Sequence, residues 1–346
     1  MDCITGKNIL LVCDNFYDYD IAIRNELIRL GAHSVYLKNV DFSITSPLNY
    51  QNLNGWVSIT LRYLLNPWGR TKWTKQFVEE IKDKRFDILL VIENTTFKKW
   101  FLSYIKKKNP GIKTIWFLWD KFSTQQLHFQ GYIPLFDRVY TFDRDDSKQY
   151  NIEYFPDFFI QTDNENSHIY DICFVGTANS SCTFHRIELM AKINRICKTR
   201  NLKSFFHLKY YNEEPKSILQ KLRRKFFKNR YERKISNYLH EGFLFDTDLP
   251  LNKVNYIMQN SDIILDLNHK NRQGMTLNVI MALANGKKLI TTNSRIIEED
   301  FYDSETICII DENNPSIPDS FFTSKSTKKD LSYLRLDYWL KHIINL

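Results

Sequence analysis

The sequence predicts an α/β protein with two parallel sheets, each flanked by helices. Short apolar runs alternate with helical patterns along most of the chain, which is typical of parallel sheets covered by helices. The chain has 346 residues, which is long for a single hydrophobic core. The segment Phe155–Ser167 contains a proline followed by a polar run, the composition expected of a linker between domains.

Residues 1–158 are expected to form the first domain. Asn8–Cys13 and Asp87–Ile92 are apolar runs of the length of buried strands, and Gly31 is a natural stop for the first helix. The segment 41–73 shows no clear period. The expected strands are Asn8–Cys13, Ser34–Leu37, Asp87–Ile92, Lys113–Trp119 and Asp137–Phe142, and the expected helices are Asp20–Leu30, Thr74–Lys82 and Thr96–Lys107.

Residues 168–325 restart the same alternation and are expected to form the second domain, with a basic insertion at 212–243. Residues 326–346 follow as a C-terminal helix. In folds of this kind the ligand binds at the carboxyl ends of the strands, in the crevice between the domains. The expected strands are Tyr170–Val175, Ser204–Leu208, Asp262–Leu267, Lys288–Thr292 and Thr306–Ile310, and the expected helices are Phe184–Arg200, Leu251–Gln259, Thr276–Asn285 and Asp330–Leu346.

The charge and the cysteine content limit the classes of partner that the protein is expected to bind and the cellular compartment in which it is expected to lie. The net charge of +8 favours anionic partners, such as nucleic acid, phosphorylated ligands or a membrane surface. The six cysteines form no C-x-x-C pair, which is typical of free thiols in a reducing compartment and argues against a zinc site. The N-terminus lacks a signal-peptide pattern, and no apolar run approaches the ~20 residues of a membrane span. We expect a cytoplasmic protein that could associate peripherally with the inner face of the cell membrane.

The segment Arg272–Asn293 holds the clearest functional pattern. A polar loop ends at Gly274, a helix follows over Thr276–Asn285, and Gly286 stops that helix before an apolar strand. A helix N-terminus behind a glycine-containing loop presents free backbone N–H groups and the positive end of the helix dipole, which suits a phosphate. The Thr276 hydroxyl could join those groups or could simply cap the helix.

This segment resembles the nucleotide-sugar segment of GT-B glycosyltransferases. Many of these enzymes carry the motif E-G-x-G-x-x-x-x-E-A-L-A-x-G, and residues 273–286 read QGMTLNVIMALANG, with the glycine at 274, Ala-Leu-Ala at 282–284 and the glycine at 286 in register. The chain also resembles lipopolysaccharide or capsule biosynthesis proteins related to CgeB-like glycosyltransferases. The runs that carry this second likeness are FVGT at Phe174–Thr177, LDLNH at Leu265–His269 and FDRVYTFDRDD at Phe136–Asp146.

The resemblance implies a fold, a donor and a site. The fold would be two Rossmann-like domains facing each other across a cleft, and the donor a nucleotide sugar of unspecified base, with no cofactor required. Neither glutamate of the motif is present, because Gln273 and Met281 stand at their positions, and the second glutamate commonly bonds the ribose in this family. Gln273 can still hydrogen-bond a sugar hydroxyl, but a thioether such as that of Met281 is a weak acceptor. Either the ribose is held elsewhere, or the protein is an altered or inactive relative.

The expected donor site lies at the ends of strands in the second domain. Gly176 and Thr177 follow a strand and Arg186 begins the next helix, so they are expected to face the diphosphate, although a plain turn with a solvated arginine would give the same pattern. Arg272 has the planar fork that suits phosphate oxygens, but its loop could also be an ordinary polar surface. The expected donor-binding residues are Gly176, Thr177, Arg186, His269, Lys270, Arg272, Gln273, Gly274 and Thr276.

Catalysis would also need a group that orients or deprotonates the acceptor hydroxyl. Asp120 follows the strand Lys113–Trp119 and is the first candidate for the general base, and Asp14, after the first strand, is the second. Either could instead cap a turn or a helix. The remaining candidates are Glu93, His128 and His185.

Metal binding is not predicted. D-x-D strings help to bind metal–nucleotide complexes in another class of glycosyltransferase, and three occur here, at Asp18-Tyr19-Asp20, Asp143-Arg144-Asp145 and Asp246-Thr247-Asp248. The string at Asp143 follows a strand and precedes a helix pattern, so the expected role of Asp143 is to cap that helix.

The run Lys216–Lys234 is the most basic part of the chain and contains the aromatic residues Phe226, Phe227 and Tyr231. A basic amphipathic helix can lie on an anionic membrane surface, and that is the expected role. The alternatives are a solvated helix whose aromatic side chains pack inward, or a nucleic-acid surface. A nucleic-acid partner is not expected, because the chain offers no recognised nucleic-acid module.

The sequence therefore predicts a glycosyltransferase that moves a sugar from a nucleotide sugar to a lipid-linked or cell-surface glycan, as in lipopolysaccharide or capsule synthesis. The first rival is another enzyme on the same fold, such as a sugar epimerase. The second is a non-catalytic protein that binds a nucleotide and a membrane.

Overall fold

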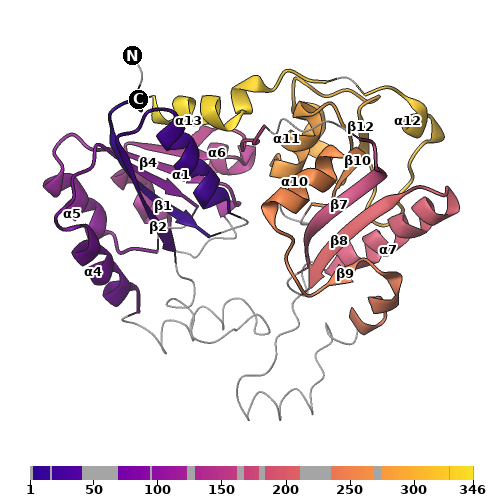
Figure 1. Cartoon of the computed structure of the whole chain (residues 1–346), viewed down its shortest axis with the longest axis horizontal. Coiled ribbons are helices and arrows are strands. Elements are labelled where there is room, and N and C mark those ends of the chain that lie inside the picture. Colours follow the sequence, from indigo (N-terminus) through magenta and orange to yellow (C-terminus); the bar gives the residue numbers. More distant parts are fainter. Residues whose placement is uncertain are drawn as a thin grey trace, which may run out of the picture. The chain divides into compact units, whose positions relative to one another are not determined.

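The computed structural model describes residues 3–15, 18–40, 69–93, 96–122, 129–161, 167–178, 184–210, 235–268, 274–326 and 328–345. These residues form two compact units, each built around a parallel sheet with helices on its faces (Figure 1). One unit comprises Met1–Gln161 with Ser332–Leu346, and the other comprises Thr162–Leu331. The predicted fold class of two parallel Rossmann-like α/β sheets is confirmed.

The sheet of the first unit has the strand order β2-β1-β3-β4-β5-β6, and all neighbours are parallel. The order reverses at β1, which has β2 on one side and β3 on the other. The strands are β1 (Asn8–Asp14), β2 (Ser34–Val40), β3 (Ile88–Ile92), β4 (Lys113–Leu118), β5 (Arg138–Thr141) and β6 (Glu153–Tyr154), and the helices are α1 (Tyr19–Arg29), α4 (Gly69–Ile81), α5 (Trp100–Lys108), α6 (Arg144–Tyr150) and α13 (Leu336–Ile344), with a 3-10 helix over Phe129–Leu135.

The sheet of the second unit has the order β12-β11-β10-β7-β8-β9, also parallel throughout. Its order reverses at β7, between β8 and β10. The strands are β7 (Tyr170–Ala178), β8 (Ser204–Tyr210), β9 (Leu244–Phe245), β10 (Ser261–Asp266), β11 (Lys288–Thr291) and β12 (Ile307–Ile309), and the helices are α7 (Phe184–Thr199), α10 (Leu251–Gln259), α11 (Leu277–Ala284) and α12 (Asp319–Thr323), with short 3-10 helices over Leu239–Glu241, Ser294–Glu298 and Ser332–Leu334, the last in the first unit.

The C-terminal helix α13 completes the core of the first unit. Trp339 is fully buried, and its indole N–H donates to the carbonyl of Pro156 at 2.9 Å. Its ring packs against Phe117 of β4 and Phe158, with centroids 4.6 and 4.9 Å apart. Asp337 at the start of α13 also pairs with Arg29 of α1 at 3.6 Å. The last residues of the chain therefore stabilise its first domain.

Three predicted helices have different starts in the structure. The tail helix was expected from Asp330 but begins at Leu336, because the backbone before it is extended and bridges Phe159, which donates its N–H to the carbonyl of Leu334 and accepts from the N–H of Leu336. The helix expected from Thr96 begins at Trp100. The helix expected from Thr74 begins earlier, at Gly69. The two-residue strands β6 and β9 were not predicted, because so short a run has no readable period.

The cysteines Cys13, Cys173, Cys197 and Cys308 are buried free thiols. Burial raises the pKa of each, to about 12 for Cys173 and about 11 for Cys197. Since the thiolate is the reactive form, these side chains act as small apolar groups of the core.

Replacement of Trp339 by alanine tests the role of α13. We expect Trp339→Ala to lower the free energy of unfolding by roughly 3–5 kcal/mol, because it leaves a cavity against two aromatic rings. The neighbouring Tyr338 is 49% exposed, so Tyr338→Ala is a matched control with an expected loss below about 1 kcal/mol. Urea denaturation measures both variants. Equal losses would show that α13 does not belong to the core of the first unit.

Candidate functional site

The second unit has its topological switch point between β7 and β10. In open parallel sheets ligands bind outside the carboxyl ends of the strands at such a point, because the loops there leave in opposite directions. The residues that follow β7 and β10 are therefore the first to consider. Gly176 and Thr177 lie near the end of β7, and Asp266 ends β10.

Asp266 ties three elements together at this edge. Its carboxylate is buried and accepts one hydrogen bond from the hydroxyl of Thr276 and one from the hydroxyl of Thr291, both at 2.9 Å. Thr276 caps α11, with its own hydroxyl oxygen accepting from the N–H of Val279 at 3.4 Å. The Thr276 hydroxyl proton is therefore committed to Asp266, and its role in the structure is to fix the start of α11.

Opposing effects act on the pKa of the Asp266 carboxyl. Burial raises its pKa above the usual value, while the hydrogen bonds from Thr291 and Thr276 and the positive charge of Arg186 oppose that rise. Arg186 donates from Nη1 to the carbonyl of Thr177 at 3.0 Å. The arginine is thus held at the end of β7 and brings a positive charge to this edge, while its role toward a donor diphosphate stays a prediction.

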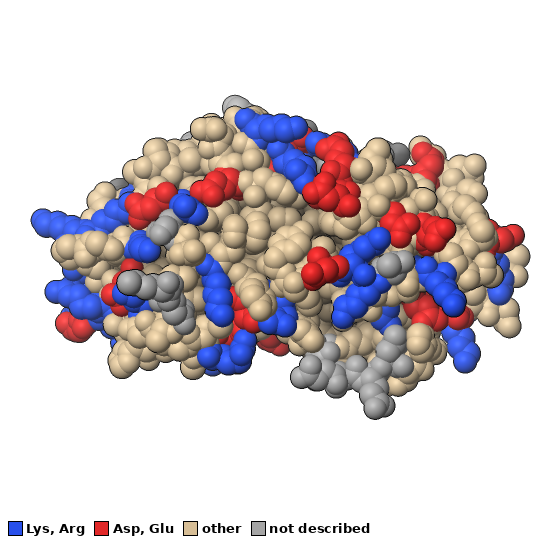
Figure 2. Space-filling model, turned by 90° about the horizontal axis from the view of Figure 1, so that it is seen from above, with Lys and Arg blue, Asp and Glu red and all other residues tan. Residues whose placement is uncertain are grey.

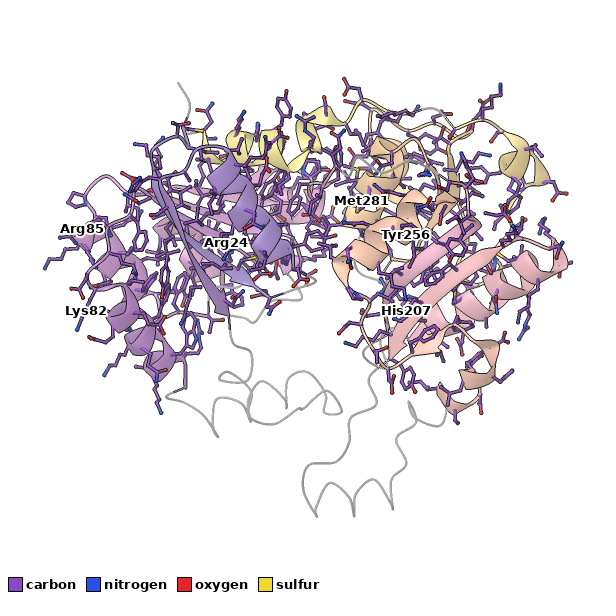
Figure 3. The ribbon with its side chains drawn as sticks, in the orientation of Figure 1. Arg24, Lys82, Arg85, His207, Tyr256 and Met281 are labelled. Atoms are coloured by element: carbon purple, nitrogen blue, oxygen red, sulfur yellow. The ribbon has the colours of Figure 1, made fainter. Side chains whose placement is uncertain are left out.

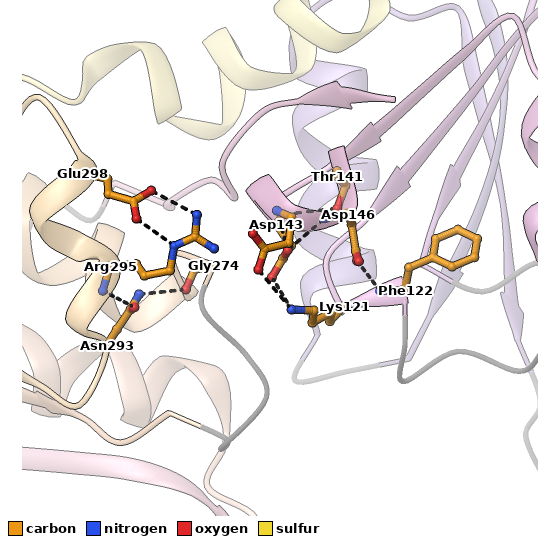
Figure 4. Close-up of polar contacts among 10 residues, drawn as sticks. Lys121, Phe122, Thr141, Asp143, Asp146, Gly274, Asn293, Arg295 and Glu298 are labelled. Carbon is orange, nitrogen blue, oxygen red and sulfur yellow. Dashed lines mark hydrogen bonds and ion pairs between the residues drawn. The ribbon is translucent and has the colours of Figure 1, made fainter. Parts of the chain in front are cut away.

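Two amide side chains join the loops around α11. Asn278, in the first turn of α11, donates to the carbonyl of Val175 in β7 at 3.4 Å. Asn293, which follows β11, donates to the carbonyl of Gly274 at 3.5 Å and accepts from the N–H of Arg295 at 3.1 Å (Figure 4). The structure therefore brings the predicted residues Gly176, Thr177, Arg186, Gly274 and Thr276 to one edge of the second sheet.

Asn268 is a polar group that the sequence analysis gave no role. The residue is only 5% exposed, its backbone N–H donates to Thr292 Oγ1 at 2.8 Å, and its carbonyl lies 3.3 Å from His185 Nε2. Its side-chain nitrogen Nδ2 has no hydrogen-bond partner within the described part of the chain. Buried amide donors are rarely left unsatisfied, so this group is available to an oxygen of a ligand at the same edge.

Four predicted donor residues, His269, Lys270, Arg272 and Gln273, lie outside the described residues, as do His128 and the basic run 216–234. Met281, which stands at the motif glutamate, is buried within α11 (Figure 3). Gly176 has a packing reason of its own, because a Cβ there would lie 2.6 Å from the buried ring of Phe174.

The corresponding edge of the first unit is acidic. Asp14 ends β1 and is buried, and Glu93 directly follows β3. Glu93 has a left-handed backbone, with φ 66°, and its carboxylate accepts from the N–H groups of Trp119 and Asp120 at 3.1 and 3.0 Å. Glu93 therefore positions the loop that carries Asp120, the predicted base, whose side chain is partly exposed.

A second acidic group surrounds the start of α6 (Figure 4). Asp143 caps the helix, accepting from the N–H groups of Asp145 and Asp146 at 2.9 and 3.0 Å, as the sequence predicted. Lys121 lies 3.7 Å from Asp143 and 3.5 Å from Asp145. Asp146 is buried and accepts from the N–H of Phe122. Across the described ranges, no three His, Cys, Asp or Glu side chains are placed to hold a metal ion.

Titration of Asp146 should be visible in the stability of the protein. Burial and the neighbouring Asp143 raise the pKa of Asp146 from 3.8 to about 6, although the N–H of Phe122 opposes the rise. The folded state thus holds this proton to a higher pH than the unfolded state, so the stabilising contribution is complete below 3.8 and is lost as the pH rises to about 6.

We expect Asp146→Asn, which stays neutral and keeps an acceptor for Phe122, to gain stability over the wild type as the pH rises. The gain should grow between about pH 4 and 6 and then level off, at roughly 1–3 kcal/mol. Asp145→Asn, at a more exposed neighbouring position, is the control. Urea denaturation across this pH range gives the comparison, and an Asp146→Asn offset that does not change with pH would contradict the assignment.

Comparison with solved structures identifies the fold. A structure described as trehalose-6-phosphate from E. coli bound with UDP-2-fluoro glucose matches with a TM-score of 0.53 at 11% identity, over 97% of this chain and 94% of that chain. A UDP-forming α,α-trehalose-phosphate synthase from Burkholderia xenovorans matches with 0.52 at 10% identity, over 97% and 93%. The N-terminal domain of Candida albicans trehalose-6-phosphate phosphatase matches with 0.51 at 10% identity, over 99% and 93%.

These similarities show a GT-B-like fold over nearly the full length of the chain. No protein-family model and no curated protein sequence matches it. Among the described helices, none is both long and apolar enough to cross a membrane.

Proposed function

We propose that the protein is a GT-B-type glycosyltransferase that uses a nucleotide sugar. The observation that carries the proposal is the edge of the second sheet, where a helix N-terminus, an arginine and a buried amide donor without a partner lie together. One of the similar structures carries a UDP-sugar analogue, and the motif-like run at residues 273–286 begins at the same edge. The helix N-terminus, the arginine and the buried amide donor all favour an anionic, oxygen-rich ligand.

In this proposal the donor diphosphate lies at the first turn of α11. The backbone N–H groups there and the Arg186 charge stabilise the leaving group, while Asn268 Nδ2 donates to a phosphate or sugar oxygen. Gly176, Thr177 and Gly274 shape the loops around it. His269, Lys270, Arg272 and Gln273 add further donors from the loop before α11. No metal is required, because cationic side chains and N–H groups can neutralise the developing charge.

The acceptor would bind at the acidic edge of the first unit. Asp120, whose backbone Glu93 holds, is the proposed general base, with Asp14 as the second candidate. A lipid-linked or cell-surface glycan is the proposed acceptor. The basic run 216–234 would keep the enzyme at the anionic membrane surface where such acceptors occur.

Nucleotide binding tests the donor site. The wild type should bind one family among UDP, GDP, CMP and ADP, measured by calorimetry and thermal shift with and without magnesium. Arg186→Gln should raise Kd roughly 10- to 100-fold, because it removes a charge-assisted contact. Arg195→Gln, at an exposed position on the same helix, is the matched control and should leave Kd within about twofold. An equal change in both variants, or no binding by the wild type, would contradict the donor site.

A second candidate function rests on Met281. Its burial in α11, where the family motif has a glutamate, removes one contact to the ribose. The chain would then be a nucleotide-binding protein without transferase activity. Nucleotide binding without any release of sugar to water or to glycan acceptors would favour this reading.

A further inference from the structure

Helices α4 and α5 form a two-helix layer on one face of the first sheet. Their apolar side chains, including Phe77 and Phe101, pack together with the sheet residues Leu89 and Trp116. The ring centroids of Phe77 and Phe101 are 4.8 Å apart. The two helices therefore lie side by side, and their outer surfaces form one continuous face.

Hydrogen bonds hold the two helices together at both ends. Near their N-termini, Arg70 donates to the carbonyls of Thr96 and Phe97, each at 3.0 Å, and the N–H of Lys98 donates to Thr74 Oγ1 at 3.0 Å. At their C-termini, the Lys108 ammonium donates to the carbonyl of Ile81, the last residue of α4, and to the carbonyl of Lys82. The relative position of the two helices is fixed, so their exposed side chains are presented as a rigid set.

The part of the chain that contains this layer is strongly basic. Residues 69–113 contain twelve Lys and Arg and five Asp and Glu, a net charge of +7, against +8 for the whole chain. Of those acids, Glu93 is buried, Glu79 pairs with Lys82 at 3.2 Å and Glu80 pairs with Lys38 at 2.6 Å. The exposed acids Glu79, Glu80 and Asp83 offset part of the positive charge, and an excess of exposed Lys and Arg side chains remains on this segment.

The positive charges lie on the exposed side of the two helices. Lys82 and Arg85 point away from the sheet (Figure 3). Figure 2, seen from above, shows Lys and Arg side chains interspersed with Asp and Glu over the visible surface. Several of these cations form no ion pair with any described residue, so their charge is available to a partner. The α4–α5 face is defined by the exposed residues Lys72, Lys75, Lys82, Lys84, Arg85, Lys99, Trp100 and Lys107.

Trp100 adds an apolar anchor to the α4–α5 face. It is 41% exposed at the first position of α5, directly after Lys99. Ser103 and Lys107 follow at helical spacing and are also exposed, so Trp100 stands on the solvent stripe of the helix. Tryptophan is enriched at membrane–water interfaces because its ring is amphipathic, and lysines beside it can keep their ammonium groups in water.

We propose that the α4–α5 face is a docking surface for an anionic lipid bilayer. Its charge complements anionic headgroups, with about 1 kcal/mol expected for each Lys or Arg near the surface. A bilayer fits better than nucleic acid, because the cations are spread over the exterior of two helices with one aromatic ring among them. This surface is separate from the run 216–234, and the inference does not depend on the proposed glycosyl transfer.

Vesicle co-sedimentation of the full chain tests the proposal. The wild type should bind vesicles of phosphatidylcholine with phosphatidylglycerol, should not bind phosphatidylcholine alone, and should be released by high salt. The variant Lys72→Gln/Lys75→Gln/Lys99→Gln/Lys107→Gln should bind at least roughly tenfold more weakly. The control Arg195→Gln/Lys203→Gln/Lys253→Gln/Lys325→Gln removes the same charge from exposed positions of the second unit and should change binding less than about twofold.

The contact of Trp100 with lipid is measured separately. Vesicles with brominated acyl chains should quench part of the tryptophan fluorescence of the wild type, and Trp100→Phe should lose that part. Quenching that survives in Trp100→Phe would place the contact elsewhere.

Four outcomes would overturn the proposal. Two concern vesicle binding itself: no binding of the wild type to anionic vesicles, or equal losses in the two quadruple variants. The third is complete loss of vesicle binding on deletion of 216–234 with no loss in the α4–α5 variant, and the fourth is a stronger effect of that variant on oligonucleotide binding than on vesicle binding. Nucleotide affinity, measured in parallel, reports on the donor site independently, so either proposal can fail alone.

Discussion

The candidate donor site depends on one buried carboxylate. Asp266 ends β10 and accepts hydrogen bonds from the start of α11 and from the end of β11. Each hydrogen bond to a charged group contributes roughly 1.5–3 kcal/mol, so these two bonds stabilise the position of the start of α11 against β10 and β11. Without this acceptor the buried hydroxyl of Thr291 would lose its hydrogen-bond acceptor, and the helix N-terminus would lose its fixed position. The geometry of the proposed phosphate-binding edge is thus set by a residue that need not contact a ligand.

Both units are six-stranded parallel sheets whose strand order reverses once, but the two orders differ and so does the chemistry at the two switch points. In the second unit that edge carries hydroxyls, an amide donor and Arg186, which together suit an anion. In the first unit Asp14, Asp20 and Glu93 are buried close enough to Cys13 to raise its pKa, after the larger effect of burial itself. Carboxylates in such number repel a phosphate and favour hydroxyl groups as partners. This difference is the reason for placing the proposed donor on the second unit and the proposed acceptor on the first.

Much of the fold could be predicted from the sequence, because buried parallel strands are continuous apolar runs with glycine or polar stops. The helix Leu251–Gln259 and the helix cap at Asp143 were also predicted correctly. The starts of α5 and α13 could not be predicted, because their preceding residues are held by distant partners, Arg70 and Phe159. The sequence does show an aspartate, Asp266, at the end of an apolar strand. Its two hydrogen-bond partners could not be predicted, because they lie 10 and 25 positions later in the chain. That Asn268 Nδ2 finds no partner among the described residues has no sequence signature at all.

Hydrogen–deuterium exchange with and without the best-binding nucleotide tests the central claim most directly. The account predicts that bound nucleotide slows exchange in the first turn of α11, around Leu277–Val279, and in the loop after β7, with little change in β12. Protection at the ends of β1 and β3 in the first unit, with none at α11, would contradict the assignment of the donor to the edge that Asp266 organises.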